Sequence, residues 1–585
     1  MKVVLRHAGK WLHFQCPEKV LRTESIEEVL PMLREAGESG LFAAGFVSYE
    51  AAPAFDPALK VQPLEGFPLL CLGLFQAPEV LDGIEVEPGA RYGLGGLESS
   101  VSKAGFVAAI GEIKKRIAEG ATYQVNYTYR LNARFSGDAW AFFHELVKDQ
   151  KAGHAAFVDT GDFAICSASP ELFFSLKEGR ILARPMKGTA RRGRTFSEDW
   201  KAAEALRESE KDRAENIMIV DMIRNDIGRI AIPGGVETLS QYDVEKYPTV
   251  WQMTSTVRGQ VEPRRNTDKH GLFENVFRAL FPCASITGAP KAKTMEIIQG
   301  LETTPRKVYT GGIGFLSPQG EACFNVAIRT ALVDRKAGRL EFGIGGGIVW
   351  DSDAEAEYEE TLTKARVLTQ PRPEFQLLET MLWEPGTGIF LLDEHLQRLG
   401  KSAAYFDVPL DQYKIFQALE ESSRTFRGSG TRIRLLVDRD GQFEVQAAPR
   451  KTSGNGVPAI ALAKEPVDSQ DIFLFHKTTH RAVYERAKAD FPDADEVVLW
   501  NERGEVTEGT IANIAIRKGD RLVTPPVGCG LLAGTFRGHL LKTGEIEEGV
   551  VSIADLKAAE EIFLLNSVRR WRRAKLASPR RYNPK

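Results

Sequence analysis

The strongest constraint on the fold is a break at residues 369–375, TQPRPEF, where two prolines follow a helical pattern that ends near residues 365–368. Proline has no amide hydrogen for a helix and disfavours helical geometry in the residue before it. A chain of 585 residues is also too long for a single hydrophobic core. We therefore expect two domains, residues 1–370 and 371–585. A glycine-rich stretch at 453–458, SGNGVP, is interpreted as a connection inside the second domain, after a strand pattern at 431–437.

The composition and charge of the chain indicate which kind of molecule it binds. The chain is 43% hydrophobic and 26% charged, typical of folded proteins, and its net charge of -3 disfavours a nucleic-acid or membrane partner. No long apolar run and no signal-peptide core are visible, so we expect a cytoplasmic protein that acts on a small molecule. The six scattered cysteines indicate buried free thiols rather than disulfides or a zinc site.

Short strand patterns, as at 342–344 and 497–500, mix with longer helical patterns without regular βαβ alternation, which predicts an α+β architecture in both domains. The run GIGGGI at 343–348 lacks the third glycine of a dinucleotide-binding loop, so that function is rejected.

Two helical patterns carry paired acids. Asp212 and Glu215 share one face of a helix predicted over 212–226, and Glu357 and Glu360, followed by Lys364, share one face of a helix over 355–364. If the two pairs face each other they repel unless a cation lies between them, and Mg²⁺ is the cation such oxygens suit. The alternative is two solvated helix faces, and spacing alone does not decide between them.

A set of further stretches resembles the chorismate-utilising enzymes, the family of anthranilate synthase component I and aminodeoxychorismate synthase component I. The stretches are YQVN at 123–126, SPELF at 169–173, RPMKGT at 184–189, IVDMIRND at 219–226, PCASITGAPK at 282–291, NVAIRT at 325–330 and GGGIV at 345–349. The resemblance covers roughly residues 1–370, more loosely before residue 100, and implies antiparallel β-sheets flanked by helices.

The resemblance also implies roles. Glu215 and Glu360 would bind Mg²⁺, with Asp212 and Glu357 in support, and Glu171 would protonate the departing hydroxyl, the alternative for Glu171 being a capping or surface carboxylate. The residues implied to bind chorismate are Gln124, Ser285, Thr287, Gly288, Tyr309, Arg329, Gly346 and Lys364.

Two positions separate the branches of the family. Gln124 stands where isochorismate and salicylate synthases have a water-activating lysine, and Lys187 stands where anthranilate synthases have alanine but aminodeoxychorismate synthases have lysine. A desolvated lysine can attack the substrate ring, whereas the alternative is a surface lysine beside neighbouring arginines. Gln252 replaces a histidine that is frequent in the family, which puts histidine-dependent steps in doubt. No glutaminase nucleophile motif is visible, so ammonia is expected from a separate glutamine amidotransferase subunit.

The second domain resembles the fold type IV pyridoxal phosphate enzymes, which include branched-chain aminotransferase, D-amino-acid aminotransferase and aminodeoxychorismate lyase. The stretches that carry this are FQLLETM at 375–381, HLQRL at 395–399, FHKTTHR at 475–481, GEVTEGTIAN at 504–513 and GTFR at 534–537. A two-subdomain α+β fold is implied, and a homodimer through this domain is compatible with it.

By this resemblance Lys477 forms the Schiff base and moves the proton, Glu508 pairs with the pyridinium nitrogen, and Arg398 with Thr535 holds the phosphate. Thr510 is implied in the same cofactor site, and Tyr484 and Asn566 in the pocket. The basic segment RRWRR at 569–573 is interpreted as a solvated terminus.

Together the two resemblances imply a bifunctional enzyme of folate synthesis. Chorismate and ammonia would give 4-amino-4-deoxychorismate, and elimination of pyruvate would then give 4-aminobenzoate. One alternative is an anthranilate synthase component I fused to a fold type IV aminotransferase. The other is a metabolite-binding regulator with degenerate sites, against which the retained acids and Lys477 count.

Overall fold

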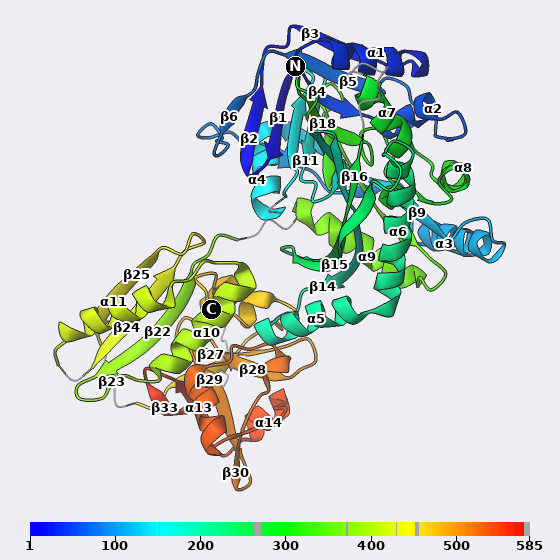
Figure 1. The fold of residues 1–585 in the computed structure, drawn as a ribbon. Helices are drawn as coiled ribbons and strands as arrows, with labels where there is room; N and C mark the ends of the chain where they lie inside the picture. The colour runs from blue at the N-terminus through cyan, green and yellow to red at the C-terminus, as the bar shows by residue number, and fades with distance from the viewer. Residues whose placement is uncertain (151, 262–270, 370–372, 429, 451–455, 578–585) are drawn as a thin grey trace. The chain divides into compact units, whose positions relative to one another are not determined.

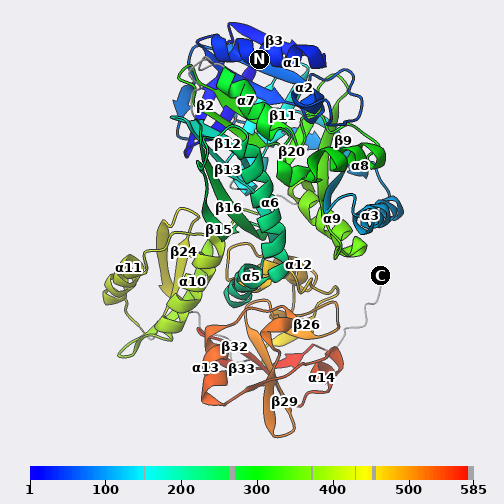
Figure 2. The ribbon, with the colours of Figure 1, turned by 45° about the vertical axis from the view of Figure 1, so that its right-hand side comes forward.

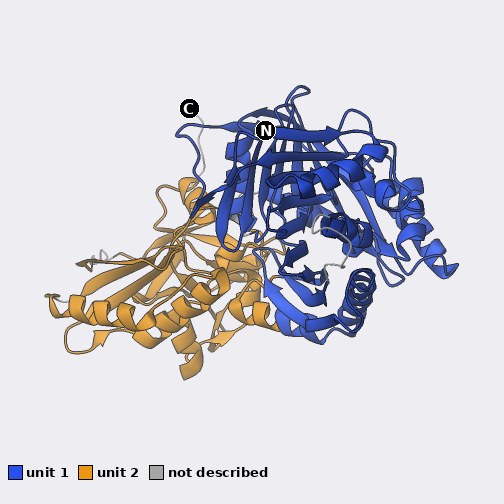
Figure 3. Cartoon of the chain, turned by 45° about the horizontal axis from the view of Figure 1, so that its top comes forward, with its two compact units in different colours: residues 1–191, 203–372 blue, residues 192–202, 373–585 orange. Residues whose placement is uncertain are grey.

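The computed structural model describes residues 1–150, 152–261, 271–369, 373–428, 430–450 and 456–577. The chain divides into two compact units, residues 1–191 with 203–372, and residues 192–202 with 373–585 (Figure 3). Residues 370–372 of the predicted domain boundary and residues 453–455 of the predicted connection lie outside the described residues. In the described part, no helix is long and apolar enough to cross a membrane.

Unit 1 contains two large antiparallel sheets (Figure 1). The first has the strand order β17 (Gly288–Ala289), β9 (Gln124–Gly137), β21 (Arg339–Ile348), β20 (Thr330–Asp334), β11 (Phe163–Ser167), β10 (Ala156–Asp159), β1 (Lys2–His7), β2 (Lys10–Phe14) and β6 (Glu79–Leu81), with β7 (Tyr92–Leu94) and β8 (Glu98–Ser99) beside β9. The second has the order β14 (Met186–Arg191), β16 (Val250–Gln260), β13 (Arg180–Arg184), β12 (Leu172–Lys177), β19 (Ala322–Val326), β18 (Gly312–Leu316), β4 (Phe42–Val47), β5 (Leu70–Phe75) and β3 (Lys19–Thr23), with β15 (Val236–Lys246) beside β16.

One buried cluster joins the two sheets. It contains Val3 and Phe14 from the first sheet and Phe46 and Phe315 from the second, and the rings of Phe14 and Phe315 lie 6.4 Å apart. The sheets therefore pack face to face, because alternate residues of each strand point into the same core.

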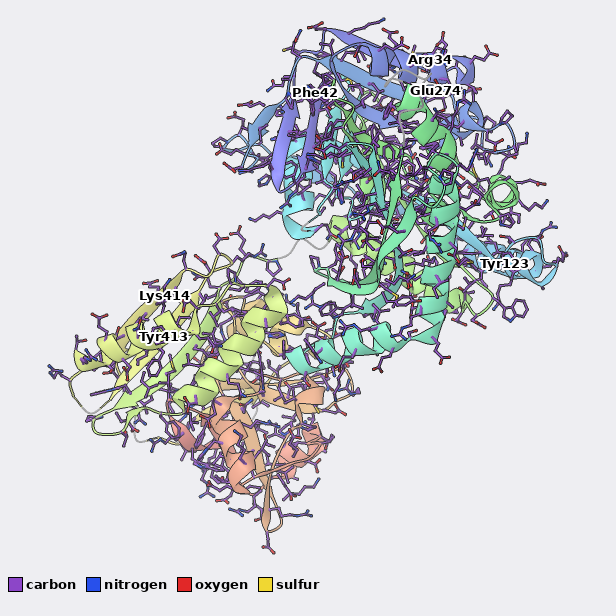
Figure 4. All side chains as sticks on the ribbon, viewed as in Figure 1. Arg34, Phe42, Tyr123, Glu274, Tyr413 and Lys414 are labelled. Atoms are coloured by element: carbon purple, nitrogen blue, oxygen red, sulfur yellow. The ribbon has the colours of Figure 1, made fainter. Side chains whose placement is uncertain are left out.

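Helices cover the edges and outer faces of these sheets. They are α1 (Ile26–Glu38), α2 (Ala52–Phe55), α3 (Lys103–Ala118), α4 (Ala139–Gln150), α6 (Glu210–Gly228), α7 (Gly271–Leu280), α8 (Lys291–Leu301) and α9 (Ala354–Thr369), with short 3₁₀ helices at Tyr49–Ala51 and Ala284–Ile286. Helix α5 (Phe196–Glu208) begins in the segment 192–202, which groups with unit 2. Figure 4 labels Arg34 on α1 and Glu274 on α7, whose ion pair of 2.9 Å ties these two helices together.

Helix α6 positions the first candidate site. Ser209 caps it by accepting a hydrogen bond from the Asp212 amide, at 3.2 Å. The helix buries Ile219, Ile223 and Ile227, spaced four residues apart, and packs against β16 and β14 (Figures 1 and 2). The predicted helices over 212–226 and 355–364 are thus confirmed as parts of α6 and α9.

Unit 2 contains two sheets. The smaller has the order β23 (Gly388–Ile389), β22 (Leu377–Glu384), β24 (Thr431–Val437) and β25 (Phe443–Pro449). The larger, with some parallel pairs, has the order β28 (Val506–Gly509), β27 (Glu496–Trp500), β26 (Ala459–Leu462), β33 (Arg570–Leu576), β32 (Ile562–Asn566), β29 (Asn513–Lys518), β30 (Arg521–Thr524) and β31 (Glu547–Glu548). The helices are α10 (Leu392–Phe406), α11 (Gln412–Arg424), α12 (Ala482–Ala489), α13 (Thr535–Thr543) and α14 (Ile553–Ala558), with 3₁₀ turns at Ile472–Leu474 and Val527–Cys529.

Residues 192–202 group with unit 2 although they follow β14 in sequence. Arg192 forms a buried ion pair with Asp199, at 2.7 Å, and donates a hydrogen bond to the Tyr405 carbonyl at 2.9 Å. The Tyr405 hydroxyl in turn donates to the Gly193 carbonyl at 2.8 Å. These contacts anchor the segment to α10.

All six cysteines are free. Cys71, Cys166, Cys283 and Cys529 are buried and Cys323 is partly buried, whereas Cys16 is exposed, so the prediction of buried thiols is wrong for Cys16.

Candidate active sites

The first candidate site lies in unit 1 around Lys187 on β14. Its amine is 3.7 Å from a carboxylate oxygen of Glu215 on α6, and the lysine side chain is only 12% exposed. Gly347 on β21 leaves room for it, since a Cβ at that position would lie 2.1 Å from the lysine nitrogen. Lys187 therefore points into the protein and not into solvent.

Gln124, the first residue of β9, lies beside this lysine. A Cβ at Gly347 would also be 2.8 Å from its amide nitrogen. Gln124 is fully buried, and neither of its amide atoms has a hydrogen-bond partner among the described residues. A buried amide without partners is costly, so this position suits a ligand that supplies them.

Glu171 is the buried acid of the site. Its Oε1 accepts a hydrogen bond from the Ser285 hydroxyl at 2.7 Å, and its side chain belongs to a residue only 3% exposed. Burial raises the pKa of Glu171 to about 7, while the hydrogen bond from Ser285 and the charge of Lys187 act in the opposite direction. A carboxyl group with such a pKa can donate a proton at neutral pH.

Asp212 and Glu215 lie on α6 as predicted, but they have different partners. Asp212 accepts a hydrogen bond from Ser209 at 2.5 Å and stands beside Gly188, where a Cβ would be 3.2 Å from its Oδ1. Glu215 faces Lys187. One helix turn therefore brings both acids to the strand that carries the lysine.

Glu357 and Glu360 on α9 form the second acidic pair. Burial and the neighbouring charge of Glu360 raise the pKa of Glu357, which accepts a hydrogen bond from Ser352 at 2.7 Å. Lys364 lowers the pKa of Glu360, to which it is paired at 2.9 Å, and also donates to the Gly345 carbonyl.

This pair stands against β21, since a Cβ at Gly346 would be 3.3 Å from the Glu357 carboxylate. Within the described ranges, no group of three or more His, Cys, Asp or Glu side chains is placed to hold a metal ion. In this arrangement Lys187 and Lys364 neutralise Glu215 and Glu360.

Tyr309 and Arg329 interact with residues other than Lys187 and the four acids. The guanidinium of Arg130 lies 5.0 Å from the Tyr309 ring centre, and burial raises the pKa of Tyr309 to about 12. Arg329 donates to Gln150 at 2.9 Å and lies over the ring of Tyr247. Among the described residues, neither forms a hydrogen bond or ion pair with Lys187 or the four acids.

The loop at 283–288 packs directly on the strand of Gln124. Thr287 is buried and its hydroxyl donates to the Cys283 carbonyl at 3.2 Å. Gly288 pairs with Val125, and a Cβ there would be 2.0 Å from the Gln124 carbonyl oxygen, so only glycine allows this approach.

Sequence reasoning missed Asn216. This residue is 1% exposed, donates to the Lys187 carbonyl at 3.3 Å and accepts from the Ser255 hydroxyl at 2.5 Å. It therefore fixes the backbone that carries the lysine, and its place one residue after Glu215 was the only available signal. Gln252 lies opposite Thr189 on the neighbouring strand and accepts its hydroxyl hydrogen bond at 3.2 Å.

The second candidate site is a cavity of about 310 Å³ in unit 2. All five residues predicted for the cofactor line it, namely Arg398, Lys477, Glu508, Thr510 and Thr535, together with Tyr484 and Asn566. These residues come from segments that are distant in sequence, and they line one cavity. The segments are strand ends, the start of a helix and an intervening loop.

Lys477 and Glu508 have strongly perturbed pKa values. Burial lowers the pKa of Lys477 to about 8, and the charge of Arg398 adds to this. Burial raises the pKa of Glu508 to about 7, although Tyr484 and the Leu532 amide donate hydrogen bonds to it at 2.8 and 3.2 Å. An amine that loses its proton near neutral pH beside a buried carboxyl is typical of a catalytic site.

Arg398 belongs to a buried triad. Its guanidinium forms two hydrogen bonds of 2.6 and 2.9 Å with Glu379, and His395 Nδ1 lies 2.6 Å from the same carboxylate. Burial alone would raise the pKa of Glu379, but Arg398 and His395 lower it to about 2. His395 Nε2 lies 3.3 Å from the hydroxyl of Thr535, the first residue of α13. Glu379 and His395 fell inside recognised stretches but were given no role.

The interpretation of residues 569–573 as a solvated terminus is wrong. Residues 570–576 form β33, which pairs with β32 and β26 inside the larger sheet. Arg572 forms an ion pair with Glu496, a residue only 1% exposed. Arg569 lines the cavity. Charge counting could not reveal that these arginines belong to a strand and a turn.

Comparison with known proteins shows what each region is similar to. Residues 79–370 match the family of chorismate binding enzymes, and residues 376–577 match class IV amino-transferases. The chain is 39% identical over 274 residues to aminodeoxychorismate synthase component 1 of Salmonella typhimurium, covering 47% of this chain and 59% of that protein. It is 33% identical over 369 residues to anthranilate synthase component 1 of Methanothermobacter marburgensis, covering 58% of this chain and 77% of that protein.

A solved structure, anthranilate synthase component I from Streptococcus pneumoniae TIGR4, superposes with a TM-score of 0.54 at 24% identity, over 63% of this chain and 92% of that one. The chain therefore belongs to the chorismate binding enzymes. Its C-terminal region is a class IV amino-transferase domain, so the protein is a fusion of the two, as predicted. The match to the Salmonella relative spans little more than half of that relative's length.

Proposed function

We propose that the first unit aminates chorismate to 4-amino-4-deoxychorismate and that the second converts this product to 4-aminobenzoate and pyruvate. The observation that supports the first step best is the placement of a largely buried lysine, Lys187, between Glu215, Gln124 and the Glu171 carboxyl group. Curated relatives such as the Salmonella protein carry the name of this synthase.

In the first step the Lys187 amine forms a bond to ring carbon C2 while the C4 hydroxyl leaves. Glu215, 3.7 Å from the amine, can take the proton that the amine must lose. Glu171 donates a proton to the leaving hydroxyl, so that water departs, because its pKa of about 7 keeps a fraction of it protonated. Ammonia then bonds to C4 and expels the lysine from C2. The sum is chorismate plus ammonia to aminodeoxychorismate plus water.

We also propose that Mg²⁺ binds at the two acidic pairs, held by Glu215 and Glu360 with Asp212 and Glu357 nearby. Carboxylate oxygens are the donor type that Mg²⁺ prefers. Since two lysines neutralise these acids in the present arrangement, no step is derived through the ion. Calorimetric titration of Mg²⁺ into the chain, with a Glu360→Gln variant beside it, tests the assignment.

The second cavity fits pyridoxal phosphate. Arg398, Thr535 and the first amides of α13 offer an anion site, Glu508 offers a carboxyl for the ring nitrogen, and Lys477 offers an amine of lowered pKa. Bound there, the cofactor would supply an electron sink for the charge left by proton loss. Lys477 takes the proton from substrate carbon C4. The C3–O bond then breaks, the enolate of pyruvate leaves and takes up a proton in place of the one that Lys477 removed, and the ring becomes aromatic.

Product analysis tests the whole proposal. The full chain is incubated with chorismate, Mg²⁺, pyridoxal phosphate and ammonium, and its products are identified by chromatography and mass. Equimolar 4-aminobenzoate and pyruvate are expected. Formation of 2-aminobenzoate would instead favour an anthranilate synthase fused to an aminotransferase, which the similarity to the Methanothermobacter protein makes the rival function.

The source of ammonia and the oligomeric state complete the proposal. The Salmonella relative is named component 1, which supports a separate amidotransferase subunit as the ammonia donor. Mass measurement of the purified chain with and without a glutaminase subunit tests both this association and a homodimer through the second domain.

A further inference from the structure

The cavity of unit 2 contains more arginine than its cofactor needs. Besides Arg398 it is lined by Arg432, Arg434, Arg481 and Arg569. Arg481 has partners of its own, since it donates a hydrogen bond to the Thr510 carbonyl and its guanidinium lies 4.5 Å from the centre of the Tyr484 ring. Arg398 has its own counter-ion in Glu379, which accepts two of its hydrogen bonds. A phosphate held by Arg398 and the start of α13 would leave Arg432, Arg434 and Arg569 unexplained.

These three arginines have no partners within the described residues. None forms an ion pair with an acid, and none of their guanidinium groups donates a hydrogen bond to another residue there. The neighbouring acid, Glu496, is already paired with Arg572. Burial lowers the pKa of Arg569, and the charges of Arg572 and Arg432 lower it further, so Arg569 is repelled by these two cations.

The backbone positions of the three arginines explain why all three line the same cavity. Arg432 and Arg434 are two apart on β24 and hence point to the same face of the sheet. They pair with Leu382 and Thr380 of β22, and Thr380 lines the same cavity.

Arg569 comes from the opposite sheet, on the turn between β32 and β33. The Asn566 side chain accepts a hydrogen bond from the Arg569 amide at 2.7 Å and fixes that turn. The Ser567 hydroxyl donates to the Thr380 carbonyl at 3.2 Å, which ties the turn to β22.

Unpaired, mutually repelling guanidinium groups in a partly closed cavity are stabilised by an anion of matching charge. One carboxylate neutralises one of the three charges and leaves two without a counter-ion. We propose that Arg432, Arg434 and Arg569 form the recognition site for a substrate with two carboxylate groups, and that Arg569 makes the cavity prefer such dicarboxylates to monocarboxylates. This inference rests on the proposed function for the substrate's identity, since aminodeoxychorismate carries a ring carboxylate and an enolpyruvyl carboxylate.

The test uses two unreactive probes that differ by one carboxylate. 3-(Carboxymethoxy)benzoate and 3-methoxybenzoate are titrated calorimetrically into the cofactor-loaded full chain. The wild type is expected to bind the dicarboxylate at least about tenfold more tightly, because a hydrogen-bonded charge pair contributes about 1.5–3 kcal/mol. Arg569→Gln should remove most of that preference and leave the affinity for 3-methoxybenzoate within about twofold, since only the second carboxylate loses its partner. Arg569→Lys should restore part of it.

The adjacent Arg570 supplies the matched control. It does not line the cavity and its guanidinium is paired with Glu384 outside it. Arg570→Gln removes the same charge one residue away and should leave both affinities unchanged. Cofactor absorbance and the midpoint of thermal unfolding establish that each variant is folded and loaded.

Three results would overturn the proposal. They are equal affinities of the wild type for the two probes, an equal loss of affinity for both probes in Arg569→Gln, and a loss in Arg570→Gln like that in Arg569→Gln. Pyruvate release from aminodeoxychorismate is measured separately. A chain that shows the Arg569-dependent preference but releases no pyruvate refutes the lyase reaction and retains the dicarboxylate site, whereas the converse refutes only the site.

Discussion

Replacing Gly347 by alanine tests the geometry of the first site. The added Cβ would come within 2.1 Å of the Lys187 nitrogen and 2.8 Å of the Gln124 amide nitrogen, both far below van der Waals contact. Each of these atoms is the end of a flexible side chain, so both can move away and the fold should survive. The lysine nitrogen must move by roughly 1 Å, and a misplacement of that size can lower a rate about 100-fold.

The assay is chorismate consumption with ammonium, followed by chromatography. We expect Gly347→Ala to lower the rate about 100-fold while the free energy of unfolding stays within about 1 kcal/mol of wild type. Pyruvate release from added aminodeoxychorismate, catalysed by the other unit, should not change.

Gly111→Ala on α3 is the matched control, because a Cβ there meets no atom within 4 Å. It should leave both activities intact and stabilise the helix by about 0.5–1 kcal/mol. A Gly347→Ala variant with wild-type chorismate consumption would refute the placement of Lys187 at the reacting carbon.

Three further predictions concern residues whose contacts are buried. Asn216→Ala should cost about 1–3 kcal/mol in the free energy of unfolding and slow chorismate consumption, since two buried hydrogen-bond partners lose their amide; unchanged denaturant unfolding would contradict this. In the cofactor-free chain Glu508→Gln should raise the midpoint of thermal unfolding at pH 8 but not below pH 4.5. The reason is that a carboxyl whose pKa is raised from 4.5 to about 7 in the folded state destabilises the fold only at a pH where it must ionise. The same variant should bind pyridoxal phosphate more weakly, as measured by absorbance titration. Arg572→Ala should lower the free energy of unfolding by about 3–5 kcal/mol, because Glu496 stays buried without its partner. Arg573 is exposed, so Arg573→Ala should lower it by less than about 1 kcal/mol. Equal losses for the two variants in chemical denaturation would argue against the pairing of β33 in the sheet.

Local sequence patterns predicted the elements that carry the sites. The four-residue spacing of apolar positions in α6 and the acids at i and i+3 were legible because a helix repeats its faces every turn. The alternating pattern at 431–437 became β24 with the same bounds. The recognised stretches also contained each of the residues predicted to bind a cofactor that line the cavity of unit 2.

Contacts between distant segments could not be read in this way. Gly347 makes room for Lys187 only because β21 and β14, which belong to different sheets, approach each other. Arg569 was counted as part of a solvated tail, since composition does not show that the following residues extend a sheet. Nothing local marks residues 192–202 as part of unit 2, because the Arg192–Asp199 pair resembles any surface pair until Tyr405 covers it.

The proposed proton donor, Glu171, and the nucleophile, ammonia, need different pH ranges, and the source of the ammonia decides whether this difference limits the rate. Burial raises this pKa to about 7, and the group must be protonated to donate, so its contribution falls as pH rises through that value. Free ammonium, by contrast, becomes the nucleophile ammonia only at distinctly alkaline pH. The rate with ammonium salts should therefore be bell-shaped, rising with the ammonia fraction and limited on the alkaline side by loss of the Glu171 proton.

A partner subunit that delivers neutral ammonia directly removes the need for alkaline pH, whereas Glu171 must still be protonated. The optimum should then shift towards neutral pH when a glutaminase subunit and glutamine replace ammonium. Glu171→Gln should lower the rate with either nitrogen source and abolish the alkaline decline that Glu171 causes, and Glu171→Asp, which keeps a carboxyl, should retain it. If the alkaline limb stays unchanged in Glu171→Gln, another group sets it and Glu171 is not the proton donor.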